Sequence, residues 1–455
     1  MQHLDTFLLA AVRAAPRRYR MPPLPADADA AASLGVDAAL AFAIEAARLA
    51  KEGGSAPSAR AQDLFTRSLA ALIGRALASE GGDPAFQALL LRAQRPAVGE
   101  YVRLAAQLAG DRRAVRAAAN AISHPGKLRD QPAGAARDAL SRLHRLAGEG
   151  AWAELAAALE QPLAQGDAAA QQAGVLLDRL RSNPALQRLA RGSALLRNAD
   201  VQRYLSLTER RGPLAGSDTA AASGRASARL GEAAERATVQ AFGAIVELLN
   251  RRGGQGAGYR VLQSLRAPVA FPGERNKAKD EWDAAIVRSG EGGGDDIVLL
   301  AEVKASPAAA SSDFSRLLRG LRRLAHADPG KTYSFASAAG EARILGGSLR
   351  RLQPQGHSLP AHVIYCCSAP AESPPQFLSA ATKAVLLGER ASLAFACELA
   401  EGKAPPPSAL LDVWDALAKE PRLRSALYQF ETARQVRSAM VHPLDLLSAL
   451  GDGPP

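Results

Sequence analysis

Two patterns of apolar residues divide the sequence. From residue 1 to about residue 210, apolar residues recur at spacings of three and four, in blocks such as VDAALAFAIEAARLAKEGG that end at Gly or Pro. This spacing puts apolar side chains on one face of a helix and predicts amphipathic helices that pack on one another. The segment 211–228 lacks the periodicity and is rich in Gly, Ser and Ala, which predicts a linker.

After this linker, short apolar runs alternate with helical patterns. The helical pattern that begins at residue 230 ends at a pair of glycines. The next apolar runs predict strands over 259–271, 281–287, 297–305 and 362–369. A second helical pattern, from residue 312, separates the third strand from the fourth. The predicted order is therefore helix, three strands, helix, strand, and the glycines of GEGGGDD suit a hairpin turn between the second and third strands.

These elements predict a chain that is mainly α with an α/β core. A length of 455 residues with 47% hydrophobic residues allows two or three packed domains. The abundance of Ala, Leu and Arg favours helix, because these side chains lose little rotamer freedom there. The predicted parts are a helical domain at 1–210, the linker at 211–228, an αβββαβ domain at 229–370 and a helical C-terminal region at 371–455.

The charge and the cysteine content bear on partners and location. The formal net charge is +11, so a polyanion is an expected partner. The three cysteines form no CxxC pair, which fits a reducing compartment and predicts a cytoplasmic protein. Apolar runs of about 18 residues are absent, and the charges of the N-terminal segment follow its apolar run instead of preceding it. Neither a membrane span nor a signal peptide is therefore expected.

Ionisable residues lie inside two strands whose other residues predict burial. Side chains alternate along a strand, so Glu281 and Asp283 share one face of the second strand, and Glu302 and Lys304 share one face of the third. If these strands pair through the glycine-rich turn, the two faces can coincide. Two carboxylates and an ammonium then meet at a margin of the sheet. Charges left uncompensated among apolar neighbours are costly, and a divalent cation is one way to compensate them.

This pair of carboxylates suits Mg2+ or Mn2+. Mg2+ binds hard oxygen ligands and keeps part of its water shell, so two carboxylates and the phosphate oxygens of a substrate complete its ligands. A metal in such a site neutralises charge on a phosphodiester and lowers the pKa of a bound water. A nearby lysine orients that water or stabilises the developing charge. The pattern therefore indicates phosphodiester cleavage.

The order of the elements, with Asp283 and Glu302-Val303-Lys304 on adjacent strands, resembles the core of the PD-(D/E)xK nuclease superfamily, which has the restriction-endonuclease-like fold. The resemblance covers about residues 229–370 and not the helical remainder. It implies that Asp283 and Glu302 bind Mg2+ or Mn2+ and that Lys304 is the catalytic lysine. It also implies a further acidic metal ligand from the first helix. Glu235 is the choice and Glu232 the alternative, because the register of that helix is open.

The sequence departs from the family in two places. Trp282 stands where the family name has proline, and the helix after Lys304 has no Gln-x-x-x-Tyr element, which leaves the subfamily open. An acidic-x-Lys tripeptide is a weak motif by itself, and the chain holds a second copy, Glu401-Gly402-Lys403, outside any predicted strand. Only the first copy has a strand, a hairpin and a preceding acidic residue around it.

Basic residues precede Asp283 in the segment ERNKAK. Arg275, Lys277 and Lys279 fall on a predicted loop and are candidates for nucleic-acid contacts, through the phosphates that flank the metal site. A solvated loop without a ligand explains the same cluster equally well.

The predicted function is that of a Mg2+-dependent nuclease, an endonuclease-type hydrolase that cleaves phosphodiester bonds of nucleic acid, with DNA favoured as the substrate. The helical domain at 1–210 would bind substrate or recruit a protein partner, and a homodimer is compatible because many such nucleases pair to cut two strands. The alternative is a catalytically inactive nuclease-like domain that serves as a nucleic-acid-binding or protein-interaction module. A third interpretation treats the chain as a helical scaffold with an incidental sheet.

Overall fold

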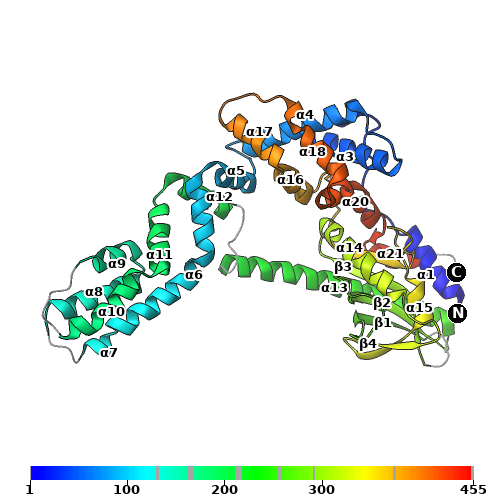
Figure 1. Cartoon of the computed structure of the whole chain (residues 1–455). Helices are drawn as coiled ribbons and strands as arrows, with labels where there is room; N and C mark the ends of the chain where they lie inside the picture. Colours follow the sequence, from blue (N-terminus) through cyan, green and yellow to red (C-terminus); the bar gives the residue numbers. More distant parts are fainter. Residues whose placement is uncertain are drawn as a thin grey trace. The chain divides into compact units, whose positions relative to one another are not determined.

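The computed structural model describes residues 2–129, 133–161, 168–210, 218–254, 258–290, 293–371 and 376–451. Over these ranges the chain is mainly helical and contains a seven-stranded sheet (Figure 1). The prediction of a mainly α chain with a β-containing core is therefore confirmed. The chain divides into two compact units. Unit 1 comprises Met1–Leu72, Gly216–Ala391 and Pro406–Pro455, and unit 2 comprises Ile73–Ala215 and Ser392–Pro405.

Unit 1 contains the sheet and the elements around it. Its strands are β1 Tyr259–Arg266, β2 Glu281–Ser289, β3 Asp295–Lys304, β4 Thr332–Ser337, β5 Gly340–Leu345, β6 Val363–Cys367 and β7 Met440–Val441. Its helices up to β6 are α1 Gln2–Ala14, α2 Ala28–Ser33, α3 Val36–Glu52, α13 Asp218–Gly253, α14 Pro307–Leu324 and α15 Gly346–Arg351. Its later helices are α16 Ala380–Leu387, η2 Pro407–Leu410, α18 Leu411–Lys419, η3 Pro421–Leu423, α19 Arg424–Leu427, α20 Gln429–Ser438 and α21 Pro443–Gly451.

Among its described residues, unit 2 consists of helices joined by turns and loops, without a strand. Its helices are α5 Pro84–Gln94, α6 Pro96–Ser123, α7 Pro125–Leu128, α8 Ala135–Glu149, α9 Trp152–Leu159, α10 Ala168–Arg181, α11 Pro184–Leu195 and α12 Ala199–Arg210. Two further helices, α4 Ala59–Leu77 and α17 Arg390–Ala400, begin in unit 1 and end in unit 2. Leu143, Leu155 and Leu189 lie in a core shared by α8, α9 and α11. Among all described helices, none is both long and apolar enough to cross a membrane.

The sheet combines an antiparallel meander with parallel strands. Its strand order is β2-β1-β4-β5-β3-β6-β7, with an additional pairing between β2 and β3. β2 pairs antiparallel with both β1 and β3, whereas β6 runs parallel to β3 and β7 parallel to β6. The antiparallel pairing of β2 with β3 agrees with the predicted hairpin, although residues 291 and 292 of its turn lie outside the described residues.

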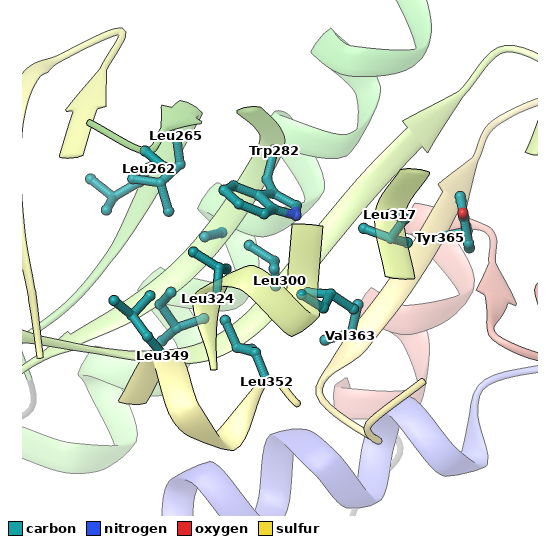
Figure 2. Close-up of a cluster of buried hydrophobic side chains, with 14 of the residues drawn as sticks. Leu262, Leu265, Trp282, Leu300, Leu317, Leu324, Leu349, Leu352, Val363 and Tyr365 are labelled. Carbon is teal, nitrogen blue, oxygen red and sulfur yellow. The ribbon is translucent and has the colours of Figure 1, made fainter. Parts of the chain in front are cut away.

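β3 is buried on both faces, as its continuous apolar run requires. On one face, Leu300 packs with residues of α14 and α15 and with Val363 of β6 (Figure 2). On the other face, Leu299 packs with Phe242 of α13 and with residues of α1 and α21. Figure 1 shows α1 and α21 side by side at this part of the unit. The sheet thus lies between two helical layers, called the α14 face and the α13 face below.

The predicted linker at 211–228 is wrong for residues 218–228, which form the start of α13. This stretch is rich in Ala and contains Arg, both strong helix formers, and their propensity outweighs that of the interspersed Gly and Ser. Residues 211–217 lie outside the described residues.

The predicted division into a helical domain at 1–210 and a separate sheet domain also differs from the observed units. Residues 1–72 and 406–455 belong to the same unit as the sheet. The Tyr19 hydroxyl donates to the carbonyl oxygens of Cys367 and Ala369, each at 2.6 Å. Lys383 Nζ donates to Asp37 Oδ2 at 2.5 Å. A helical pattern tells which face of a helix is buried but not which element buries it, so the sequence did not assign these helices to the sheet.

Candidate functional site

β2 and β3 diverge at one end of their pairing. They pair from Ser289↔Asp295 to Ala284↔Ala301, with one register shift between Ile286 and Val287. Beyond this point β2 continues along β1, as far as Arg266↔Glu281, and β3 continues along β6, as far as Lys304↔Cys367. The diverging ends, residues 281–283 of β2 and 302–304 of β3, are called the fork. Side chains at the fork are not covered by the opposite strand, so they have room for partners other than the backbone.

A local irregularity in β1 lies beside the fork. Gln263 pairs with Ala284 and Leu265 pairs with Trp282, whereas Ser264 between them has a φ of 51°. A non-glycine residue in this left-handed region is uncommon, so Ser264 marks a local irregularity of the backbone beside the fork. Trp282 lies on the α14 face with Leu265, its partner in β1 (Figure 2).

Asp283 closes the gap that the divergence opens. Its Oδ2 atom accepts a hydrogen bond from the backbone N–H of Val303 at 2.6 Å. The Asp283 carboxylate thus takes the place of a backbone carbonyl on the opposite strand, and it is half-buried. This bond fixes the carboxylate between the two strand ends.

Glu302 is the most buried charged residue of the fork, with 1% of its side chain exposed. Its Oε1 atom accepts hydrogen bonds from Lys279 Nζ at 2.5 Å and from Lys304 Nζ at 2.6 Å. Its Oε2 atom is buried and has no hydrogen-bond partner among the residues that the structure describes. Buried carboxylate oxygens are nearly always bonded, so Oε2 is an unused acceptor at the fork.

A second carboxylate completes the group of charges. Lys304 Nζ lies 3.0 Å from Asp313 Oδ2, and Lys279 Nζ lies 3.7 Å from the same oxygen. The exposed fractions of the Lys279, Lys304 and Asp313 side chains are 15%, 18% and 13%. These three residues and Glu302 are called the fork ion cluster. It pairs two ammonium groups with two carboxylates in a largely buried position, with Asp283 beside it.

The pKa values of the cluster reflect burial and the neighbouring charges. Burial, followed by the nearby Asp283 carboxylate, raises the pKa of Glu302 to about 7, against the opposing effect of the two lysines. Burial disfavours the charge on Asp313, but Lys279 and Lys304 together hold its pKa below the usual value. Burial likewise disfavours the charge on Lys304, but Glu302 and Asp313 hold its pKa above the usual value. Asp313 and Lys304 therefore keep their charges near neutral pH, while Glu302 lies close to its titration point.

The loop before β2 is fixed against α14, and this attachment positions Lys279. The backbone N–H of Lys279 donates to the carbonyl of Arg316 at 3.1 Å. Arg319 and Arg323 of α14 donate to the carbonyls of Lys277 and Phe271, at 3.1 and 2.9 Å. These contacts hold residues 271, 277 and 279 of the loop against α14.

Gly320 of α14 makes this close approach sterically possible. A Cβ atom at residue 320 would lie 2.6 Å from the carbonyl oxygen of Lys279, a separation that forces the loop backbone to shift. Glycine therefore allows the loop to pack directly on the helix, and this packing places Lys279 at the fork.

The structure distinguishes the two first-helix candidates, Glu235 and Glu232. Glu232 lies 3.7 Å from Arg236 in an exposed pair. Glu235 is exposed as well, but partial desolvation and then the Asp283 carboxylate raise its pKa. Glu235 is therefore the residue of the two that lies within electrostatic reach of the fork.

The three basic loop residues do not share one environment. Arg275 is exposed and pairs with Asp280 at 2.9 Å, and Lys277 is exposed, with a φ of 54°. Lys279 instead points into the fork ion cluster. Arg275 and Lys277 remain candidates for contacts with phosphates, whereas Lys279 belongs to the site itself.

Two members of the cluster were not assigned to it from the sequence. Asp313 lies on the buried side of α14, three residues after Ala310 and four before Leu317, both of which are buried. A carboxylate within the apolar stripe of a helix was the signal for it. Lys279 gave no comparable signal, because its place depends on the packing of the loop against Gly320.

The donor set of the fork fits a hard divalent cation. Asp283 and Glu302 provide carboxylate oxygens, and the unused Oε2 of Glu302 is a free acceptor. Within the described residues, no group of three or more His, Cys, Asp or Glu side chains is arranged to hold a metal ion. The chain would therefore supply two carboxylates, and water and substrate oxygens would complete the ligands of Mg2+ or Mn2+.

Comparisons with known proteins give no relative for this chain: no family model, curated protein or solved structure matches it.

Proposed function

We propose that this protein is a Mg2+- or Mn2+-dependent nuclease that hydrolyses phosphodiester bonds of nucleic acid, with DNA favoured, and that residues 229–370 adopt a restriction-endonuclease-like fold. One observation carries the proposal. The sheet forks at Asp283 and Glu302, and there a buried carboxylate with one unused oxygen lies in contact with Lys304.

Each residue of the fork has a role in such a reaction. A divalent cation, when bound, neutralises charge on the scissile phosphate and lowers the pKa of a bound water. Asp283 and Glu302 hold that cation, and the Val303 N–H keeps Asp283 in position. Lys304 places a positive charge beside the reacting group, where it orients water or stabilises the developing negative charge. Asp313 keeps Lys304 charged and directed toward the fork. Glu235 adds a carboxylate from α13.

Exposed cations near the fork suit a polyanionic substrate. Arg275 and Lys277 lie on the loop before β2, and Arg316 of α14 is 58% exposed and lies 3.8 Å from Asp313. Such residues bind phosphates without reading sequence. They would hold the backbone of the nucleic acid on either side of the cleaved bond.

The proposal is tested by nicking of supercoiled plasmid DNA in Mg2+, in Mn2+ and in excess chelator. The wild type should nick DNA only with a divalent ion, and Lys304→Ala should lower the rate about 100-fold or more, because it removes a preorganised charge from the site. Lys403→Ala is the matched control, because Lys403 is exposed and pairs with Glu401 in the second acidic-x-Lys motif. Equal rates for wild type and Lys304→Ala would contradict the assignment.

One observation favours the alternative, a nuclease-like module that binds nucleic acid or protein without cleavage. The charge of Glu302 is already compensated by two lysines, so the cluster is electrostatically complete without a metal. Retention of Asp283, Glu302 and Lys304 favours the enzyme. Absence of metal-dependent nicking together with retained DNA binding would instead support the module.

A further inference from the structure

Lys279 and Lys304 contact the same oxygen of Glu302, but their other attachments differ. Lys304 lies on β3, two residues from Glu302, and its ammonium is also 3.0 Å from Asp313. Lys279 lies on the loop before β2, and its ammonium is 3.7 Å from Asp313. Lys304 therefore has a second close carboxylate, whereas Lys279 depends mainly on Glu302.

We propose that Lys279 is a displaceable counter-ion, which competes with a divalent cation for Glu302 and so sets the affinity of the fork for metal. This inference rests on the proposed function, since it requires that a cation binds at the fork. It adds a residue that the metal-site pattern in the sequence did not include.

The burial of Glu302 explains why its charge needs a counter-ion and why that counter-ion is displaced when a metal ion binds. With 1% of its side chain exposed, Glu302 cannot keep its charge by hydration, so the two ammonium groups stabilise the carboxylate when no metal is bound. A divalent cation on the same carboxylate places two further positive charges beside both lysines, and the repulsion is relieved most easily if one ammonium leaves. Displacement of Lys279 from Glu302 costs less free energy than displacement of Lys304, because Lys304 is also held by Asp313.

The surroundings of Lys279 allow this movement without a change of fold. Its backbone is fixed to α14 through the Arg316 carbonyl and by the close packing on Gly320. The Lys279 side chain is already 15% exposed, so a rotation about its torsions can turn the ammonium toward solvent. Only side-chain torsions need to change, and the loop stays in place.

The test is a titration of the full-length chain with Mn2+, followed by the electron paramagnetic resonance of free Mn2+. Lys279→Met should bind Mn2+ about tenfold more tightly than the wild type, because a charge-assisted bond to the metal ligand no longer has to be broken. Arg316→Met is the matched control. It removes a positive charge that lies near Asp313 but has no contact with Glu302, so its effect should stay within about threefold, as for a partly screened charge.

A second variant gives the opposite expectation. Lys279→Arg offers a guanidinium that binds carboxylates with two parallel hydrogen bonds, so it should weaken Mn2+ binding relative to the wild type. This variant provides the answer if circular dichroism shows that Lys279→Met does not fold.

The outcomes separate this inference from the proposed function. Equal Mn2+ affinity in the wild type and both Lys279 variants would overturn the role of Lys279 and leave the metal site intact. No Mn2+ binding in any of them at millimolar concentration would overturn the metal site itself, and with it both proposals.

Discussion

The two ends of the β2–β3 hairpin carry contrasting groups of charged residues. The fork ion cluster lies at one end. At the other end, Arg288 of β2 contacts both Asp5 of α1 and Asp296 of β3, at 2.6 and 3.1 Å, and Arg351 contacts Asp296 at 2.8 Å. These four residues are called the Arg288 network. Each group has two members on these strands: Glu302 and Lys304 at the fork, with 1% and 18% of their side chains exposed, and Arg288 and Asp296 at the other end, with 14% and 19%. Arg351 is more exposed, at 55%.

The difference lies in how fully the carboxylates are bonded. In the Arg288 network each oxygen of Asp5 and Asp296 has a partner, including the Tyr259 hydroxyl at 2.7 Å. The strands there are paired in register, with Arg288 opposite Asp296. At the fork, Glu302 has two lysines on one oxygen and none on the other. The two groups therefore differ in that Glu302 has a carboxylate oxygen without a partner among the described residues, at a break in strand pairing.

The two clusters also differ in their basic residues, which are arginines in the Arg288 network and lysines in the fork ion cluster. Arginine binds carboxylates through a rigid planar fork of donors and stays in place, which suits the joining of α1 to the sheet. Lysine is a point charge on a flexible stem that can move when another cation arrives. The Arg288 network thus has the properties of a structural clamp, and the fork ion cluster has those of an exchangeable site.

The largest expected effect separates catalysis from structure. If the proposed function holds, Glu302→Gln should lower the rate of metal-dependent DNA cleavage about 100-fold or more, because it removes the charge of a proposed metal ligand. Asp296→Asn, a change of the same kind in the Arg288 network, should leave the rate per folded molecule within about twofold. Initial rates at saturating Mg2+ would measure both. A comparable loss in both variants would remove the distinction between the two clusters.

The next effect is on stability, and it is expected in the Arg288 network instead of at the fork. Arg288→Met should lower the free energy of unfolding by about 2 kcal/mol or more, because it leaves the Asp5 and Asp296 carboxylates without a shared partner in a largely buried position. Chemical denaturation followed by circular dichroism would measure this loss. The folded fraction should still cleave DNA at the wild-type rate, so a variant that is fully stable, or folded but inactive, would show that the network is not a clamp.

The smallest expected effect concerns pH. His362 precedes β6, and its pKa is lowered, first by burial and then by Arg351 of the Arg288 network. Because the unfolded chain binds a proton at His362 more readily than the folded one, this residue lowers stability as the pH falls below its ordinary pKa of about 6.5. His362→Gln should therefore lose less stability than the wild type between about pH 7 and pH 5, by up to about 1 kcal/mol. Denaturation curves of both proteins at a series of pH values would check this difference, and parallel pH profiles would refute it.

The sequence by itself determined the local features of the site. Strand alternation places Glu302 and Lys304 on one face of β3, and the apolar run around them determines that this strand lies inside the unit. The hairpin then brings Asp283 of β2 next to the segment of β3 that carries Glu302 and Lys304. These features follow from residues close together in the chain, where backbone geometry leaves few alternatives.

Only the tertiary structure decided the partners that come from distant segments. Lys279 reaches Glu302 because its loop packs on Gly320, and Asp313 reaches Lys304 because α14 covers the same face of the sheet. Residues 1–72 join the sheet through contacts such as that of Tyr19 with β6. Hydrophobic patterning fixes which side of an element is buried, but the choice of neighbour depends on the packing of the whole unit, so no local pattern contains it.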